Sequence, residues 1–262
     1  MRPSCAILGE RNASAMGTFL TLLVNFLYPP RCAACAVRLT AATPARLCAY
    51  CQEHIERAAG AQCSRCGDVL RSATLAGGAT LCPRCVNNPP SFRAVYAATI
   101  YHSLDTGSDN PVPSLIRRHK YGLDQSLSRA LAECLPDPLP LRREAYDLIV
   151  PVPLHRKRLR WRGFNQSALL GTELARRLRL PLAVGCLRRV RATPPQTAQT
   201  HAARLKNVAG AFALRNPQRI SGQRVLLVDD VVTTGATVDE CARVLLAAGA
   251  AVVDVFALAR VL

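Results

Sequence analysis

The sequence predicts an α/β domain, built as a parallel sheet flanked by helices, that follows a smaller cysteine-rich module. Two apolar runs, 148–150 and 225–228, have the composition of strands buried on both faces, and segments with helical spacing come after each of them. Four C-x-x-C pairs between residues 32 and 85 predict a module held together by metal. The chain has 262 residues, which is enough for one domain of ordinary size and such a module.

We expect three parts along the chain, at 1–30, 31–90 and 91–262. The first part is an extension with a short amphipathic helix, and either Met1 or Met16 can be its first residue. Its apolar stretch, 16–27, is interrupted by polar residues, is too short to span a membrane and precedes no convincing cleavage site. The turn-forming sequence Asn-Asn-Pro-Pro at 87–90 ends the cysteine-rich part. With no signal for secretion, we expect a reducing, cytoplasmic location.

The α/β part is expected to alternate strands and helices. Strands are expected at 94–101, 148–150, 225–228 and 251–258. Helices are expected from residue 114, over 126–134 and 165–178, and again after the third strand. In this last helix Val238, Cys241 and Leu245 fall on one face, and Gly249 suits its C-terminal end. A strand, a helix and a second strand in this order imply right-handed parallel crossovers.

The eight paired cysteines have the residue type and spacing of two tetrahedral zinc sites. Twelve, eleven and fifteen residues separate successive pairs, and a two-residue spacer lets both sulfurs of a pair reach one ion. We pair them in sequence, with Cys32, Cys35, Cys48 and Cys51 on one ion and Cys63, Cys66, Cys82 and Cys85 on the other. A crossed pairing stays open. Because thiolates fill all four positions, the zinc is expected to be structural, and redox dithiols or disulfides are the less favoured alternatives.

The chain is strongly basic, with a formal net charge of +17. Between residues 148 and 228 there are sixteen Lys and Arg against one acidic residue, Glu173. A solvated basic surface is one interpretation, but the concentration of charge favours a surface that meets a polyanion, either a phosphorylated substrate or nucleic acid. Within residues 31–92, which contain the cysteine pairs, Tyr50 and Phe92 are the only aromatics, which is little for stacking nucleic-acid bases.

Residues 225–237, VLLVDDVVTTGAT, form the most informative motif. An apolar strand ends at two carboxylates, Asp229 and Asp230, and a short hydroxyl-rich loop leads into a helix. Gly235 lets the backbone approach a phosphate, toward which the amides of the loop and helix start would point. Carboxylates at the end of a strand in an open α/β sheet can accept hydrogen bonds from ribose hydroxyls. An ordinary acid-capped turn is the alternative, but two acids with T-T-G-x-T at this junction favour a sugar-phosphate site.

This motif resembles the binding motif for phosphoribosyl pyrophosphate (PRPP) in type I phosphoribosyltransferases. The wider chain resembles one branch of them, the ComF (competence protein F, GntX-like) family. The matching segments are 151–155 (PVPLH), 162–166 (RGFNQ), 193–196 (TPPQ), Arg204 with Asn207, and 257–260 (ALAR), together with the cysteine-rich front as a double zinc ribbon. Gln199 departs from the family, which usually has Leu there.

The resemblance implies the type I phosphoribosyltransferase fold, binding of Mg²⁺ with PRPP, and transfer of phosphoribosyl to an acceptor that no residue identifies. It also implies that the turn after 148–150 faces the diphosphate and that 187–211 is a flexible loop that closes over PRPP. The residues expected to bind PRPP are Val152, Pro153, His155, Arg158, Arg162, Asp229, Asp230, Val231, Val232, Thr233, Thr234, Gly235, Ala236 and Thr237. Those expected to act in catalysis, by positioning and charge stabilisation, are Asp229, Asp230, Arg191 and Arg204.

Two functional hypotheses follow. In the first, the chain is a phosphoribosyltransferase linked to natural competence and DNA uptake. In the second, it is a non-catalytic adaptor of the DNA-uptake machinery that binds PRPP or single-stranded DNA and meets a competence helicase. Both can hold for one protein. Changing Asp229 and Asp230 separates them, because PRPP binding depends on these carboxylates and salt-sensitive DNA binding does not.

Overall fold

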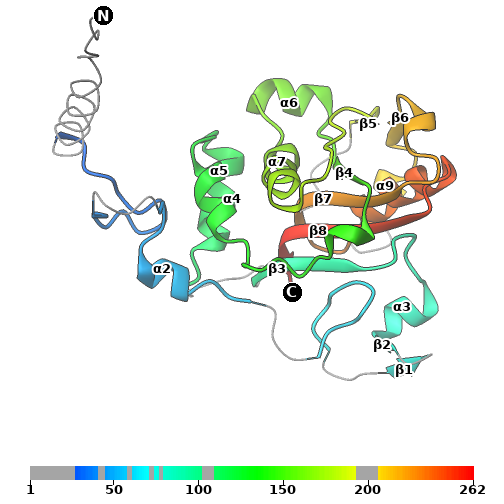
Figure 1. Cartoon of the computed structure of the whole chain (residues 1–262), viewed down its shortest axis with the longest axis horizontal. Helices are drawn as coiled ribbons and strands as arrows, with labels where there is room; N and C mark the ends of the chain where they lie inside the picture. The colour runs from blue at the N-terminus through cyan, green and yellow to red at the C-terminus, as the bar shows by residue number, and fades with distance from the viewer. Residues whose placement is uncertain are drawn as a thin grey trace, which may run out of the picture.

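The centre of the computed structural model is a four-stranded parallel sheet (Figure 1). The structure describes residues 27–40, 45–57, 61–70, 74–76, 79–101, 109–192 and 206–262. The strands of this sheet are β3 (Val95–Tyr101), β4 (Leu148–Pro151), β7 (Arg224–Val232) and β8 (Val252–Val261). Their order across the sheet is β3-β8-β7-β4, and each neighbouring pair is parallel. Such a sheet needs crossover connections, which cover its faces.

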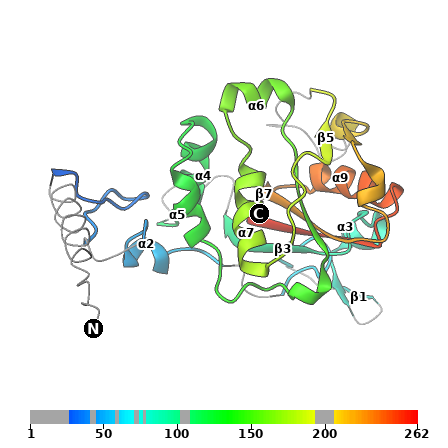
Figure 2. The ribbon, with the colours of Figure 1, turned by 45° about the horizontal axis from the view of Figure 1, so that its top comes forward.

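Helices cover both faces of the sheet (Figures 1 and 2). One face carries α4 (Val112–Tyr121), α5 (Leu127–Glu133) and α7 (Gln166–Leu178). The other carries α9 (Ala236–Ala247) and the hairpin of β5 (Leu187–Arg189) and β6 (Phe212–Leu214). Successive side chains of a strand point to opposite faces, so Leu226 and Val228 pack in the first core and Val225 and Leu227 in the second.

The connecting segments include further short helices. These are α6 (Arg156–Arg162) and the 3-10 turns η1 (Arg143–Ala145) and η2 (Pro217–Arg219). Figure 1 shows α6 beyond the end of β4. Among the described residues, no helix combines the length and the apolar character needed to cross a membrane.

The α/β order expected from the sequence is confirmed, with two differences. The strand β7 is longer than expected, because its pairing with β8 continues to Val232 while its pairing with β4 ends at Val228. Asp229 and Asp230 therefore lie inside the strand, at the point where one of its neighbours has ended. The second difference is that α6 and the β5–β6 hairpin were not predicted.

The two cysteine-rich segments pack against different parts of the α/β domain. The first ribbon, residues 31–55, contains α2 (Ala49–Glu53), and its Leu47 and Ile55 share a core with α4 and α5. Glu133 of α5 also accepts a hydrogen bond from the Leu47 backbone N at 3.0 Å. The second ribbon, residues 61–87, contains β1 (Thr74–Ala76), β2 (Ala79–Leu81) and α3 (Pro83–Asn87). It is joined to the sheet by the Val95 N, which donates to the Arg65 O at 2.8 Å.

A buried carboxylate, Asp254, ties three segments together. Its side chain is fully buried in β8, where Oδ1 accepts from Arg93 Nε at 2.9 Å and Oδ2 accepts from Tyr146 Oη at 2.8 Å. Asp254→Ala leaves the buried Tyr146 hydroxyl without its acceptor, while Arg93 is half-exposed and can turn to water, so we expect the free energy of unfolding in urea to fall by about 1–3 kcal/mol. The control is Asp147→Ala, which removes a half-exposed ion pair with Arg224 and is expected to cost less. Equal losses in the two variants would show that burial does not set the cost.

Candidate functional site

Two neighbouring carboxylates, Asp229 and Asp230, stand where β4 stops pairing with β7. Asp229 Oδ1 accepts hydrogen bonds from Ser167 Oγ of α7 and from the Asp230 backbone N, each at 2.9 Å. Asp230 Oδ2 forms an ion pair with Lys120 Nζ of α4 at 2.8 Å. Burial, together with the negative charge of Asp230, raises the pKa of Asp229 to about 7. Asp229 therefore changes its charge near neutral pH.

The loop after β7 presents the amino terminus of α9. Gly235 immediately precedes this helix and has a φ of +83°, a conformation that favours glycine. A Cβ at this position would lie 3.8 Å from the Phe92 ring, so the backbone conformation rather than crowding requires the glycine. Gly235 supplies no capping side chain, and the amides of a first helical turn have no partners within the helix. Those of Thr237 and Val238 are therefore suited to bind a phosphate, whereas the Ala236 N already donates to Thr234 Oγ1 at 3.5 Å.

The turn after β4 lies at the same edge of the sheet as the acid pair. Val152 continues the pairing, because its backbone N donates to the Val228 O at 2.8 Å. Its carbonyl accepts a hydrogen bond from Asn165 Nδ2 at 3.1 Å. His155 then begins α6, and its Nδ1 accepts a hydrogen bond from the Lys157 N at 3.3 Å. The turn predicted to face a diphosphate is thus held against the strand that carries Asp229.

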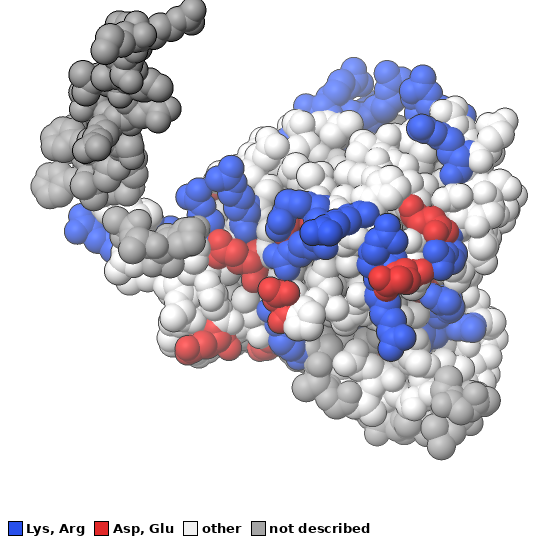
Figure 3. All heavy atoms as spheres, in the orientation of Figure 1, with Lys and Arg blue, Asp and Glu red and all other residues white. Residues whose placement is uncertain are grey.

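The basic residues expected near the diphosphate separate into two groups. His155 and Arg158 line an open pocket of about 340 Å³, together with Lys157, Trp161, Arg189 and Ala192. Figure 3 shows Lys and Arg side chains gathered along the edge of the molecule that α6 forms. Arg162 instead turns inward, where it is 8% exposed and its Nη1 donates to Gln166 Oε1 at 2.8 Å. It does not line that pocket, although its guanidinium carbon lies 5.8 Å from the centre of the Trp161 ring.

Of the two arginines expected in the flexible loop, the structure describes Arg191 but not Arg204. Arg191 Nη2 donates to the carbonyls of Asn207 and Ala209, at 3.0 and 2.7 Å. Its guanidinium therefore joins described residues on either side of the segment 193–205. Arg204 belongs to that segment, which lies outside the described residues, as does the sequence TPPQ at 193–196.

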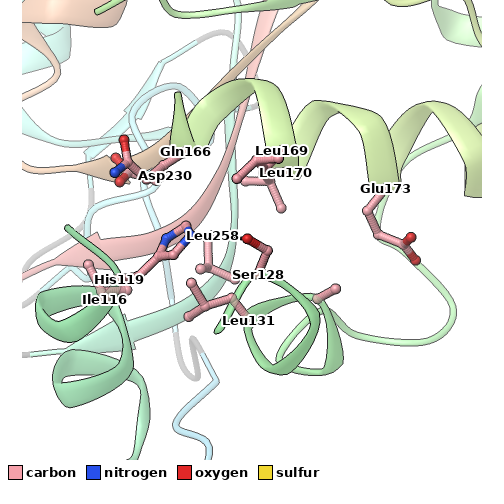
Figure 4. A pocket seen from close by; sticks show the side chains of 11 residues that line it. Ile116, His119, Ser128, Leu131, Gln166, Leu169, Leu170, Glu173, Asp230 and Leu258 are labelled. Carbon is pink, nitrogen blue, oxygen red and sulfur yellow. Dashed lines mark hydrogen bonds between the residues drawn. The ribbon is translucent and has the colours of Figure 1, made fainter. Parts of the chain in front are cut away.

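A small pocket lies beside Asp230, between α4, α5 and α7 (Figure 4). Its volume is about 20 Å³, enough for one water-sized molecule. His119 Nε2 lies 3.1 Å from Ser128 Oγ, and burial lowers the pKa of His119 to about 4, so its imidazole is neutral at neutral pH. Gln166 is 3% exposed, and its Nε2 has no hydrogen-bond partner among the described residues. The lining residues are Ile116, His119, Ser128, Leu131, Ala132, Gln166, Leu169, Leu170, Glu173, Asp230 and Leu258.

Several residues around the acid pair were not predicted as site residues, namely Lys120, Ser167, His119 and Gln166. For Ser167 a local signal existed, because Asn165 precedes it and Asn165 Oδ1 accepts a hydrogen bond from the Ser167 N at 3.2 Å, as an N-terminal helix cap does. A cap at Asn165 places Ser167 in the first turn of α7. His119 and Lys120 lie on α4, more than a hundred residues before the motif, and no local pattern marks them.

The paired cysteines form two four-sulfur clusters, and the Sγ atoms in each lie within 4.8 Å of one another. The grouping is sequential, as expected, and the crossed alternative is wrong. Sulfurs at about 2.3 Å from a tetrahedral zinc ion lie about 3.8 Å apart. Two of the distances are close to that value, 3.6 Å between Cys35 and Cys48 and 3.7 Å between Cys66 and Cys82. The donors therefore fit two structural zinc ions.

Comparison with known proteins places these features in a family. The model of the phosphoribosyl transferase domain matches residues 165–261, and the model of the double zinc ribbon domain matches residues 23–86. The DNA utilization protein YhgH of Salmonella typhimurium is 33% identical over 221 residues, covering 82% of this chain and 91% of that protein. The protein of the same name from Escherichia coli is 37% identical over 186 residues, 69% of this chain and 78% of its own length.

A further relative carries the family name itself. Competence protein F of Haemophilus influenzae is 31% identical over 227 residues, which cover 81% of this chain and 96% of that protein. Identity at this level, over most of both chains, agrees with the parallel sheet and with the two cysteine clusters. The chain therefore belongs to the ComF (competence protein F) family, which joins a double zinc ribbon to a type I phosphoribosyltransferase fold.

Proposed function

We propose that the chain binds Mg²⁺ with PRPP at the end of β7 and transfers phosphoribosyl to an acceptor in the cytoplasm, in a role linked to DNA uptake. One observation carries the proposal: Asp229, Asp230, the start of α9 and the turn after β4 meet at one edge of the sheet. Carboxylates suit ribose hydroxyls, helix amides suit a 5-phosphate, and the turn suits a diphosphate. A ribose that carries phosphate groups at both ends needs these three elements together.

In the proposed reaction the bond from C1 of the ribose to pyrophosphate breaks as the nucleophilic atom of the acceptor bonds to C1. Pyrophosphate leaves with the bonding electrons, and the acceptor gives up its proton to solvent. Positive charge develops on the ribose ring, where ionised Asp229 and Asp230 stabilise it. The protein holds and orients both reactants, so no covalent intermediate with the protein is required. Lys120 balances the charge of the acid pair before the substrate arrives.

The residues at this edge also fit Mg²⁺. The carboxylates of Asp229 and Asp230 and the hydroxyls of Thr233 and Thr234 are oxygen donors, which this cation prefers. Asp229 and Asp230 would hold it. When bound with PRPP, Mg²⁺ neutralises charge on the leaving pyrophosphate.

Calorimetric titration of Mg²⁺ and PRPP into the zinc-loaded protein tests the proposal. We expect saturable binding that requires Mg²⁺, is competed by pyrophosphate and is weaker for ribose 5-phosphate, which lacks the diphosphate. Pyrophosphate release in the presence of candidate amines and bases then tests the transfer step. A titration without saturable heat would remove PRPP as the ligand. Binding without release for any acceptor would leave the chain a PRPP-binding protein.

Binding is expected to tighten as pH rises from 6 to 8. Asp229 must be ionised to accept hydrogen bonds from ribose hydroxyls, and its pKa in the free protein is raised to about 7. Below that pH the ligand must displace a proton, which costs at most about tenfold in affinity per pH unit. Calorimetry at pH 7 in two buffers with different heats of ionisation measures the proton directly. Identical heats in the two buffers would show that Asp229 does not change its charge on binding.

A second candidate function rests on α6. This helix has the sequence RKRLRWR, and Trp161 is 54% exposed among its basic neighbours. An exposed aromatic ring for stacking and nearby cations for phosphates are typical of surfaces that bind single-stranded nucleic acid. On this alternative the chain is a non-catalytic adaptor that binds single-stranded DNA next to a competence helicase. It predicts DNA binding that weakens steeply with salt and does not depend on the acid pair.

A further inference from the structure

The second ribbon contacts the phosphate-binding loop through Arg84 of α3. Arg84 Nη1 donates to the Thr234 carbonyl at 3.2 Å, and Arg84 directly precedes Cys85 and lies close enough to Cys66 for the two side chains to interact. Cys66 is one of the four sulfurs of the second cluster. The residue just before Gly235 is therefore linked by one side chain to the metal site of the second ribbon.

A second arginine, Arg260 of β8, holds the preceding loop residue, Thr233, in a similar way. It is 2% exposed, and its Nη1 donates to the Thr233 carbonyl. Its Nη2 lies 3.7 Å from Asp68 Oδ2, and Asp68 follows Cys66 by two residues. Two successive carbonyls of the loop are thus held by two arginines, each of which has its other partner in the second ribbon.

These bonds fix the direction of the loop amides. In a planar trans peptide the C=O and the following N–H point in opposite directions. Because the carbonyls of Thr233 and Thr234 are held toward the ribbon, the N–H groups of Thr234 and Gly235 are directed away from it. A crevice of about 120 Å³ lies between the α3 region and the start of α9, and it is lined by both Arg84 and Thr234, which the hydrogen bond joins.

The charge of the second cluster strengthens the link. Cysteine ligands bind metal as thiolates, and four thiolates outweigh the charge of one Zn²⁺, so the loaded site is an anion. Arg84 lies between this anion and the Thr234 carbonyl. The first ribbon, by contrast, packs on α4 and α5. The two metal sites therefore have different neighbours, and the second is the one that touches the loop.

We infer that Arg84 and Arg260 are positioning residues that hold 233–235 against the zinc-loaded second ribbon and so direct the loop amides toward a bound phosphate. The inference rests on the proposed function for the identity of the ligand, which is the 5-phosphate of PRPP. The orientation of the loop itself is a property of the protein without ligand.

The test compares the full-length, zinc-loaded wild type with Arg84→Met, which keeps the apolar stem and removes the donors. We expect the variant to retain two zinc ions, to bind Mg²⁺ with PRPP about tenfold more weakly, and to exchange the amide hydrogens of 233–238 several-fold faster without ligand. Arg84→Lys keeps the charge and a donor and should recover part of the affinity. Arg176→Met, which removes a surface ion pair with Glu173 on α7, is the matched control and should change neither readout.

A second variant guards against a folding defect in the first. Asp68→Asn releases Arg260 without touching a zinc ligand, and it should also speed exchange in 233–238, by a smaller factor. Unchanged exchange and affinity in both variants would overturn the inference. If the wild type itself fails to bind Mg²⁺ with PRPP, the proposed function fails, while the exchange rates still decide whether the two arginines hold the loop.

Discussion

The double variant Asp229→Asn/Asp230→Asn is expected to lose saturable binding of Mg²⁺ with PRPP. Each carboxylate accepts charge-assisted hydrogen bonds from the ribose in our proposal, and such bonds contribute about 1.5–3 kcal/mol each. Losing both weakens binding by roughly a hundredfold to ten-thousandfold, which takes the titration beyond the range of calorimetry. The measurement is the same titration as for the wild type, at pH 8, where Asp229 of the wild type is ionised.

The fold of this double variant is expected to survive. Burial and the charge of Asp230 raise the pKa of Asp229, so the two charges oppose one another in the native protein and their removal relieves that repulsion. Asp147→Asn, at the opposite end of the strand pair, is the control and should leave binding intact. Wild-type affinity in the double variant would place the PRPP site elsewhere. Retention of salt-sensitive DNA binding by the same variant would establish that the two activities use different surfaces.

Removal of both zinc ions is expected to destabilise the α/β domain as well as the ribbons. Leu47 and Ile55 of the first ribbon are buried in the core that α4 and α5 form with the sheet. Losing the burial of two such side chains costs about 3–6 kcal/mol, which lowers the unfolding temperature of a chain of this size by roughly 6–24 °C. Thermal unfolding followed by circular dichroism, with and without a zinc chelator, measures the shift, and a colorimetric zinc assay confirms removal.

The control for zinc removal is Cys186→Ala. Cys186 is buried beside β5 and lies outside both clusters, so this variant should retain both ions and keep its response to the chelator. An unfolding temperature that does not change on chelation would mean that the ribbons hold their shape without metal. Loss of PRPP binding at a temperature where the sheet is still folded is expected, because the second cluster adjoins the phosphate-binding loop.

The parts of the fold that the sequence predicted are those that depend on neighbouring residues. Apolar runs marked β4 and β7, helical spacing marked α7 and α9, and the two-residue spacer marked each cysteine pair. The helix α6 was not predicted, because its sequence RKRLRWR has no apolar stripe. Its available signals were the ends, where His155 caps the helix and Gly163 closes it in a left-handed conformation.

The residues of the candidate site also divide into those that a local sequence pattern predicts and those that it does not. Asp229, Asp230 and Gly235 lie in one contiguous motif, so their residue types and spacing sufficed. Lys120 reaches Asp230 from α4, and Arg84 reaches Thr234 across 150 residues of sequence. Contacts over such separations are set by how helices and ribbons pack on the sheet, and one sequence carries no local pattern for them. The expectations for Arg204 and for 193–196 fall outside the described residues and stay predictions.

The order of strands has a consequence for the synthesis of the protein. The strand β8 lies between β3 and β7, yet the ribosome makes it after both. While residues 252–261 are still inside the exit tunnel, neither β3 nor β7 can pair with β8. The edges of β3 and β7 that later form hydrogen bonds with β8 are therefore unpaired. A nascent chain stalled at this stage presents unpaired strand edges, on which aggregation begins and to which chaperones bind. Completion of the sheet, and with it the arrival of Arg260 at the loop, must therefore follow the synthesis of every other strand of this sheet.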